Sequence, residues 1–230
     1  YQRYLKRYLR CVKGVDDNVG RLFRYLEAEG LMDKTVIIYT GDQGFMLGEH
    51  DYIDKRWMYE ESMRMPLLVR YPPMIKAGSR NRELVNNTDF APTILALGGV
   101  KTPGFMQGRS FSEMLRGSIP GDWRTATYYR YWMHMAHHWN PAHFGIRTKK
   151  HKLIFYYGLP ITGSENATLP AWELYDMEKD PHEMNNVYSD PAYAGAREKL
   201  KDELKRVRRE LKEEDSSPAI NAVLEKHWKS

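Results

Sequence analysis

Asp42 and Gln43 are adjacent side chains whose oxygens can bind a metal ion, and a glycine flanks the pair on each side. They follow Thr35-Val-Ile-Ile-Tyr-Thr40, a β-branched run that predicts a buried strand of a parallel sheet. Open α/β sheets bind ligands at the carboxyl ends of such strands. A carboxylate beside an amide carbonyl offers two hard oxygen ligands, which suit Ca²⁺ or Mg²⁺ better than zinc. The pair therefore predicts a hard-cation site, with an ordinary polar turn as the alternative.

A lysine and a histidine follow in the next polar and aromatic stretch. Lys55 lies thirteen residues after Asp42, and His50 falls between them. A lysine ammonium is a compact point charge and a usual partner for an anionic oxygen near a metal. Lys55 is thus a candidate anion-binding residue, and an exposed loop lysine is the alternative on composition alone.

A second candidate region runs from Tyr128 to His143 and is rich in tyrosine, tryptophan and histidine. It contains four histidines within sixteen positions: His134, His137, His138 and His143. Aromatic faces stack on sugar rings, and imidazole groups hydrogen-bond hydroxyl and sulfate oxygens. The histidines fit no usual zinc-ligand spacing, and the segment has no carboxylate or cysteine to complete a zinc site. The region predicts either the wall of a substrate pocket or a packed aromatic loop with structural histidines.

The elements that position these residues alternate in the α/β manner. A long amphipathic helix is indicated by apolar residues spaced 4, 3, 4, 3 and 4 positions apart: Tyr8, Val12, Val15, Val19, Leu22 and Leu26. Gly30 stands where a glycine commonly ends a helix. A second strand is predicted over residues 66–71, and a second helix over residues 88–97.

The pattern changes after about residue 120. Short aromatic runs separated by turn residues predict a small antiparallel sheet, at 128–131, 144–148, 152–157 and 172–177. A 4, 3, 4 spacing then predicts a surface helix: Leu200, Leu204, Val207 and Leu211. The chain is therefore divided into residues 1–120, part of an α/β domain, and residues 121–230, a small subdomain of antiparallel sheet and helix.

The composition excludes several classes of protein. The 230 residues are 42% hydrophobic and 28% charged, which is enough apolar material for a core and unlike a disordered or fibrous chain. The mean hydropathy is −0.67, and no apolar stretch approaches the ~18–20 residues that cross a bilayer. The single cysteine, Cys11, excludes an internal disulfide framework.

The net charge of +5 is partly concentrated near the start of the sequence. Five basic residues precede the first acid: Arg3, Lys6, Arg7, Arg10 and Lys13. The positive surplus suits anionic partners, nucleic acid and sulfated glycans alike. For this cluster, a solvated helix face is the commoner interpretation. We expect no nucleic-acid partner. Because Tyr1 already lies in a helical pattern, we expect the chain to be the downstream part of something longer.

Several short motifs follow one another along the chain in a characteristic order. The first half contains Gly-Asp-Gln-Gly, Leu-Gly-Glu-His, Asp-Lys-Arg, Tyr-Glu-Glu-Ser and Pro-Leu-Leu-Val-Arg-Tyr-Pro. The series continues with Thr88-Asp-Phe-Ala-Pro-Thr-Ile-Leu, Gly108-Arg-Ser-Phe, Gly145-Ile-Arg-Thr, Lys152-Leu-Ile and Glu173-Leu-Tyr-Asp-Met-Glu-Lys-Asp-Pro181. The combination resembles the C-terminal half of the type I, formylglycine-dependent sulfatases of the alkaline-phosphatase-like superfamily. The resemblance covers about residues 8–210.

This resemblance implies a fold and a set of residue roles. Residues 1–120 would be the C-terminal part of the α/β catalytic domain, with a parallel sheet and flanking helices. Asp42 and Gln43 would bind the active-site calcium, with Mg²⁺ as an alternative, and Lys55 would contact the sulfate group. His50 would line the pocket or brace the loop. The C-terminal subdomain contributes to the substrate cleft in carbohydrate sulfatases, which assigns substrate contacts to His134, His137, His138 and His143.

The sequence departs from the family in its nucleophile. Sulfatases of this type make formylglycine from the Cys or Ser of a Cys/Ser-x-Pro-x-Arg motif. Cys11 lacks that context, and the Ser-x-Pro patterns at Ser118, Ser189 and Ser216 lack the arginine. We therefore expect the nucleophile and the remaining metal ligands to come from a missing N-terminal half, without which this chain would be inert.

The expected reaction is removal of sulfate from a sulfated saccharide, in a periplasmic or secreted enzyme. Two alternatives stay open. One is a phosphoric ester hydrolase of the same superfamily, which shares the metal and lysine chemistry. The other is a non-catalytic glycan-binding fragment.

Overall fold

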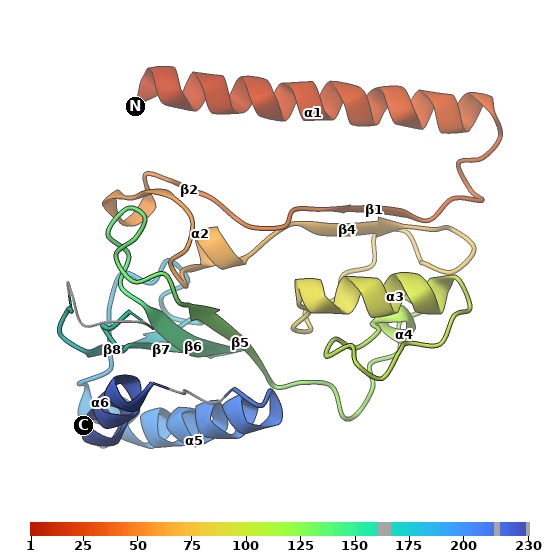
Figure 1. Cartoon of the computed structure of the whole chain (residues 1–230). Helices are drawn as coiled ribbons and strands as arrows, with labels where there is room; N and C mark the ends of the chain where they lie inside the picture. The colour runs from red at the N-terminus through yellow and green to blue at the C-terminus, as the bar shows by residue number, and fades with distance from the viewer. Residues whose placement is uncertain (161–166, 214–216, 229–230) are drawn as a thin grey trace.

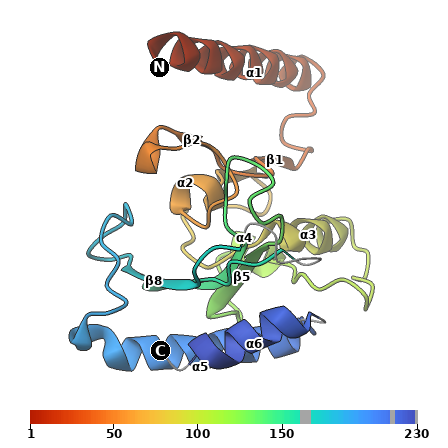
Figure 2. The same ribbon diagram turned by 60° about the vertical axis from the view of Figure 1, so that its left-hand side comes forward.

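The computed structural model describes residues 1–160, 167–213 and 217–228. Ser216, one of the serines tested above, lies outside them. Helix α1 (Gln2–Ala28) forms where the apolar spacing predicts it, and Gly30 follows its end with a φ of 63°. In both views α1 is the outermost layer of the molecule (Figures 1 and 2). None of the described helices is long and apolar enough to span a membrane.

The apolar stripe of α1 is mostly open in this structure. Leu26 is the buried residue of the helix, whereas Val12 and Val15 on the same stripe are 46% and 49% exposed. Leu22 is also exposed. The amphipathic pattern therefore predicted the helix correctly, but within the described residues most of its apolar stripe has no covering surface.

Strand β1 (Ile37–Thr40) pairs with β4 (Leu67–Arg70), and both strands form where they were predicted. Their pairing is antiparallel, with Ile37 opposite Arg70 and Thr40 opposite Leu67, whereas the sequence analysis placed the first strand in a parallel sheet. A parallel pair needs a crossover that returns the chain to the starting end, and no long crossover helix lies between these strands. The chain instead passes through short elements and turns back.

The segment between β1 and β4 carries the first group of candidate residues. It contains β2 (Met46–Leu47), the short 3₁₀ turn η1 (Glu49–Asp51), β3 (Ile53–Asp54) and the one-turn helix α2 (Glu60–Met63). Strands β2 and β3 pair antiparallel as a two-stranded ribbon. We call residues 41–63 the site loop.

A third group of elements follows β4. It consists of η2 (Asn87–Asp89), α3 (Phe90–Leu97) and α4 (Ser112–Leu115). Asp89 is fully buried and forms a capping box with Asn86, as well as an ion pair with Arg124. The helix predicted over residues 88–97 is thus confirmed.

The C-terminal part is built on a four-stranded antiparallel sheet in sequence order. Its strands are β5 (Ala126–Tyr131), β6 (His143–Thr148), β7 (His151–Tyr156) and β8 (Ala171–Asp176). The turn η3 (Pro191–Tyr193) leads into α5 (Ala194–Glu210), and α6 (Pro218–His227) lies beside it below the sheet (Figure 1). The predicted antiparallel sheet with its covering helix is confirmed. The division near residue 120 stays a prediction.

The two faces of this sheet pack against different parts of the chain. Side chains alternate along a strand, so Phe155 packs in the cluster with Leu200 and Leu204 of α5. Its neighbours Ile154 and Tyr156 point to the opposite face, where they pack with residues of the site loop. Gly145 on β6 permits this contact, because a Cβ there would lie 2.7 Å from the Met58 sulfur. The sheet is therefore the platform on which the site loop rests.

Candidate metal- and anion-binding site

Gln43 has a fixed orientation in the turn after β1. Its Nε2 donates to the backbone oxygen of Ser62 at 3.1 Å and to the Ser62 Oγ at 3.2 Å. The amide oxygen accepts no hydrogen bond from the described residues, so it is available to a ligand. Asp42 is exposed, and its carboxylate likewise has no partner in the described part of the chain.

The turn is held close to α2 by a glycine. The Gly44 N–H donates to the backbone oxygen of Ser62 at 2.9 Å. A Cβ at this position would lie 2.1 Å from the Glu61 backbone oxygen, so no larger residue fits without a backbone shift. The close approach holds Gln43 and Gly44 against Ser62, the buried residue of α2.

Lys55 lies in the same loop and is half-buried. Its ammonium has no hydrogen bond or ion pair with any described residue. Its two neighbours Asp54 and Arg56 have φ values of 124° and 105°, and they form an ion pair with each other. Such backbone conformations are costly for side-chain-bearing residues and are often found at functional sites. A half-buried cation without a carboxylate partner is suited to bind an anion.

His50 is packed within the site loop. Its ring stacks on Tyr59 with centroids 4.2 Å apart, and its Nε2 lies 3.7 Å from Glu61 Oε2. The Tyr59 hydroxyl donates to Glu173 Oε2 on β8 at 3.1 Å. Burial raises the pKa of Tyr59, so this hydroxyl stays protonated and able to donate. These contacts are those of a residue that braces the loop, while a substrate contact by His50 stays a prediction.

The structure separates the four histidines of the second region into two pairs. His137 and His138 are exposed in the connection between β5 and β6, and His138 Nε2 lies 3.7 Å from Asp54 Oδ2. His134 and His143 are buried. The His134 Nδ1 accepts a hydrogen bond from the Ala142 N–H at 3.0 Å. Of the four histidines, only His137 and His138 are therefore exposed, and His138 lies beside the site loop.

His143 is enclosed by aromatic rings at the start of β6. Its ring lies 5.1 Å from that of Tyr156 and 6.1 Å from that of Trp57, measured between centroids. Burial lowers the pKa of His143 to about 4, although the Pro141 backbone oxygen opposes this shift. The side chain is thus a neutral part of the core at neutral pH.

Hydrogen bonds connect the histidine segment to the site loop. The Tyr52 hydroxyl is hydrogen-bonded to the side chain of Asn140, a fully buried residue. The Tyr52 ring also meets the His138 ring edge-on, with centroids 6.2 Å apart. The structure therefore places exposed His138 close to the loop that carries Lys55.

Beneath α2 lies a buried group of charges that the sequence analysis did not identify. Lys152 on β7 is fully buried, with its Nζ 2.6 Å from Glu183 Oε1 and 3.0 Å from Glu60 Oε1. The Arg147 Nε donates to Glu60 Oε1 at 2.9 Å. Burial alone would raise the pKa of Glu60, but Lys152 and Arg147 outweigh it and lower that pKa to about 2. Glu60 is therefore a fixed carboxylate at neutral pH.

Ser62 was also missed as a site residue. The Tyr-Glu-Glu-Ser motif contains both Glu60 and Ser62, so it was the available signal. The motif alone does not indicate a role, because a serine and a glutamate in a short helix carry no evident chemistry until their partners are known.

The donor set fits part of a hard-cation site. Asp42 and Gln43 offer a carboxylate and a fixed amide oxygen, both without other partners among the described residues. Calcium takes ~6–8 oxygen ligands, and no group of three or more His, Cys, Asp or Glu in the described residues could hold a metal. Further ligands are needed to complete such a site.

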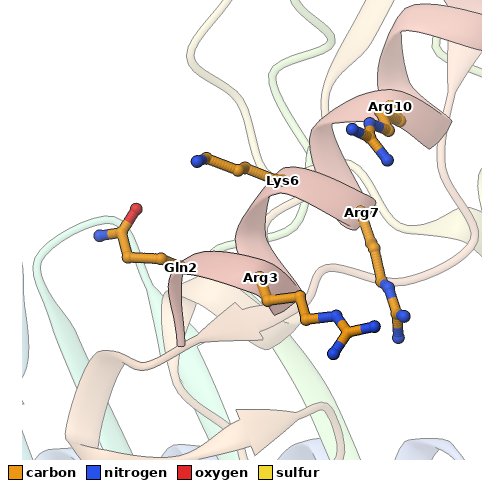
Figure 3. A pocket seen from close by; sticks show the side chains of 5 residues that line it. All are labelled: Gln2, Arg3, Lys6, Arg7 and Arg10. Carbon is orange, nitrogen blue, oxygen red and sulfur yellow. The ribbon is translucent and has the colours of Figure 1, made fainter.

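A shallow hollow on α1 is a separate feature. Arg3, Lys6, Arg7 and Arg10 line it together with Gln2 (Figure 3). None of these four cations forms an ion pair within the described residues. It lies on the outermost helix and shares no residue with the site loop.

Sequence comparisons match most of the chain. The sequence pattern of the family "N-sulphoglucosamine sulphohydrolase, C-terminal" matches residues 48–210. An N-acetylglucosamine-6-O-sulfatase of Bacteroides thetaiotaomicron is 46% identical over 217 residues, which are 94% of this chain and 37% of that protein. The multifunctional alkaline phosphatase superfamily protein PehA of Trinickia caryophylli is 31% identical, over 81% of this chain and 37% of that protein.

Solved structures show the same fold. A protein in complex with its substrate D-glucosamine-2-N,6-O-disulfate superposes with a TM-score of 0.82 at 45% identity, over 90% of this chain and 40% of that one. The phosphonate monoester hydrolase of Agrobacterium radiobacter gives 0.72 at 26% identity, over 85% and 39%.

The fold and these likenesses define the class as the alkaline-phosphatase-like hydrolases. Within that class, the chain belongs to the sulfatases, in the N-sulphoglucosamine sulphohydrolase C-terminal family. The resemblance based on the motifs is thereby confirmed. The chain spans 37% of the length of the first two relatives.

Proposed function

We propose that this chain supplies the metal- and sulfate-binding half of a sulfatase that removes sulfate from a sulfated carbohydrate. The observation that carries the proposal is the site loop itself. The Asp42 carboxylate, the Gln43 amide oxygen and the Lys55 ammonium have no partners among the described residues, and they are connected through one buried serine. The 46% identity to an N-acetylglucosamine-6-O-sulfatase supports sulfate ester hydrolysis as the reaction.

The residues have distinct roles in this proposal. Asp42 and Gln43 would hold a calcium ion, or Mg²⁺, as two of its oxygen ligands. Such a divalent cation would supply positive charge that offsets the negative charge on the transferring group. Lys55 binds another sulfate oxygen and stabilises the charge that develops there. The formylglycine nucleophile is not among these residues, because the sequence contains no Cys/Ser-x-Pro-x-Arg motif.

We further propose the N-terminal half of the same enzyme as the partner of this chain. The apolar stripe of α1 supports this, because Val12 and Val15 are about half exposed. A surface of that kind is unusual for a monomer in water. The relatives are also much longer than this chain, which covers 37% of the first. That half would bring the nucleophile and the remaining metal ligands.

The proposed substrate class is a sulfated amino sugar. The relative with 45% identity binds D-glucosamine-2-N,6-O-disulfate, and exposed His138 lies next to the site loop here. The proposed location is the periplasm or the outside of the cell. A Drosophila relative named as an extracellular sulfatase, 41% identical over 108 residues, supports it.

A phosphorus ester hydrolase is the second candidate. The structural likeness to a phosphonate monoester hydrolase, at 26% identity, favours it specifically. A tetrahedral phosphoryl group carries the same kind of anionic oxygens as a sulfate group, so a metal and a lysine serve both.

The test is an assay of the intact protein with glucosamine 6-sulfate and with a phosphonate monoester. We expect turnover of the sulfate ester, and Lys55→Ala should lower its kcat/KM by roughly 10²-fold or more, because a fixed charge-stabilising group is lost. Lys101→Ala, at an exposed lysine, is the control and should leave kcat/KM unchanged.

Three outcomes would oppose the proposal. Turnover of the phosphonate alone would favour the second candidate. Binding of the sugar without turnover of either ester would indicate a glycan-binding fragment. Near-wild-type turnover by Lys55→Ala would make Lys55 an ordinary loop residue.

A further inference from the structure

Ser62 is a buried meeting point for the segments that carry the candidate residues. It is fully buried in α2. Its backbone oxygen accepts from the Gly44 N–H at 2.9 Å and from Gln43 Nε2 at 3.1 Å. Its Oγ accepts from Gln43 Nε2 at 3.2 Å and from the Arg56 N–H at 3.1 Å. One hydroxyl thus joins the Gln43 amide to the peptide unit between Lys55 and Arg56.

The helix that holds Ser62 is too short to fix its own position. It has four residues, and isolated helices of that length are unstable in water. Its first residue, Glu60, is held by Lys152 and Arg147 of the sheet, and the Glu60 N–H donates to Glu183 Oε2 at 2.7 Å. The buried charges therefore set where Ser62 lies.

We propose that Ser62 is a positioning residue that sets the distance and orientation between the Gln43 ligand oxygen and the Lys55 ammonium. This inference rests on the proposed function. Without the hydroxyl, Gln43 keeps its bond to the Ser62 backbone oxygen, but the Arg56 N–H loses its only acceptor among the described residues. The segment carrying Lys55 then moves independently of the metal-binding turn.

Two substitutions separate hydrogen bonding from packing. Ser62→Ala removes the hydroxyl, and Ser62→Cys fills the same space with a poor hydrogen-bond acceptor. We expect both to weaken calcium binding in the intact protein about tenfold and to weaken inhibition by inorganic sulfate by a similar factor, as loss of one buried hydrogen bond implies. Calcium binding is measured by titration calorimetry without substrate, and sulfate binding by its inhibition constant.

Thr93→Val is the matched control. Thr93 is also fully buried, and its hydroxyl also accepts from a backbone N–H, that of Phe111 at 3.0 Å. It lies on α3, outside the site loop. The control should lower the melting temperature as Ser62→Ala does, yet leave both binding constants unchanged.

The outcomes distinguish this inference from the proposed function. Wild-type calcium and sulfate binding in Ser62→Ala would overturn the positioning role and leave the function standing. Full rescue by Ser62→Cys would show that packing alone matters, and would also overturn it. If Ser62→Ala does not fold, Ser62→Cys alone decides. A wild-type protein that binds neither calcium nor sulfate would overturn the proposed function itself.

Discussion

At the scale of single residues, the candidate site depends on side chains that are held in place while some of their polar atoms have no hydrogen-bond partner among the described residues. The Gln43 amide N–H groups donate to Ser62, and its amide oxygen has no hydrogen-bond partner among the described residues. None of the three N–H donors of the Lys55 ammonium is bonded to a described residue. Buried polar groups are normally paired, so side chains that are anchored at one atom and open at another are candidates for ligand contacts.

The first prediction at this scale concerns the proposed metal. Asp42→Ala in the intact protein should abolish calcium retention and activity, because it removes the charged ligand of a hard-cation site. Gln43→Ala should do less damage, because the lost ligand is neutral. Elemental analysis of the purified proteins measures this directly. Equal calcium content in wild type and Asp42→Ala would contradict the assignment.

At the scale of elements, the buried charges on β7 anchor the site loop to the C-terminal sheet. Lys152→Met should lower the free energy of unfolding by about 3–5 kcal/mol, because Glu60 and Glu183 would lose their buried cation. Lys150→Met is the control, since the Lys150 ion pair with Glu178 is exposed and should contribute less than about 1 kcal/mol. Denaturant titration of the intact protein measures both.

Lys152→Met should also change how the free energy of unfolding depends on pH. The pKa of Glu60 is lowered from 4.5 to about 2 in the folded protein, so its ionised form stabilises the fold above its ordinary pKa. That stability is lost as the pH falls from 4.5 towards 2. The loss should be smaller in Lys152→Met, whose Glu60 lacks one of its two cations. An equal loss in both proteins would show that Glu60 is not held by Lys152.

The sequence predicted the positions of helices and strands better than it predicted how the strands pair and which side chains come into contact. Local patterns of spacing and capping placed β1, β4, the aromatic strands and the helices α1, α3 and α5, but not α2, α4 or α6. They did not predict that β1 and β4 pair antiparallel, because pairing depends on the path of the chain between them. Asp42 and Gln43 are candidate ligands from their place after a strand, and that assignment stays a prediction. The role of Ser62 was not identifiable, because it requires the close approach of Gly44 to α2.

His143 illustrates the same limit. The sequence left two interpretations for this histidine, a substrate contact or a structural histidine in a packed aromatic loop. Its neighbours in the structure come from three separate segments, at Trp57, Tyr129 and Tyr156. Only the folded chain shows that these rings surround it.

At the scale of the whole molecule, the connection between β5 and β6 lies beside the site loop. In the intact protein, His138→Ala should raise KM for a sulfated saccharide about threefold or more, because one hydrogen bond to the sugar is lost. An aryl sulfate, which reaches only the sulfate subsite, should keep its KM. His182→Ala, at an exposed histidine, is the control. Equal losses on both substrates would indicate a folding defect instead.

The contacts that fix the site loop also determine when it can form during synthesis. Glu60 and Glu183 are 123 positions apart, and Tyr59 and Glu173 are 114 apart. A ribosome that has completed the site loop has not yet made the residues that hold it. Contacts of such wide separation close slowly, because a long loop must be ordered first. The nascent chain therefore exposes the turn that carries Asp42 and Gln43 without its support until β8 and the segment after it have emerged.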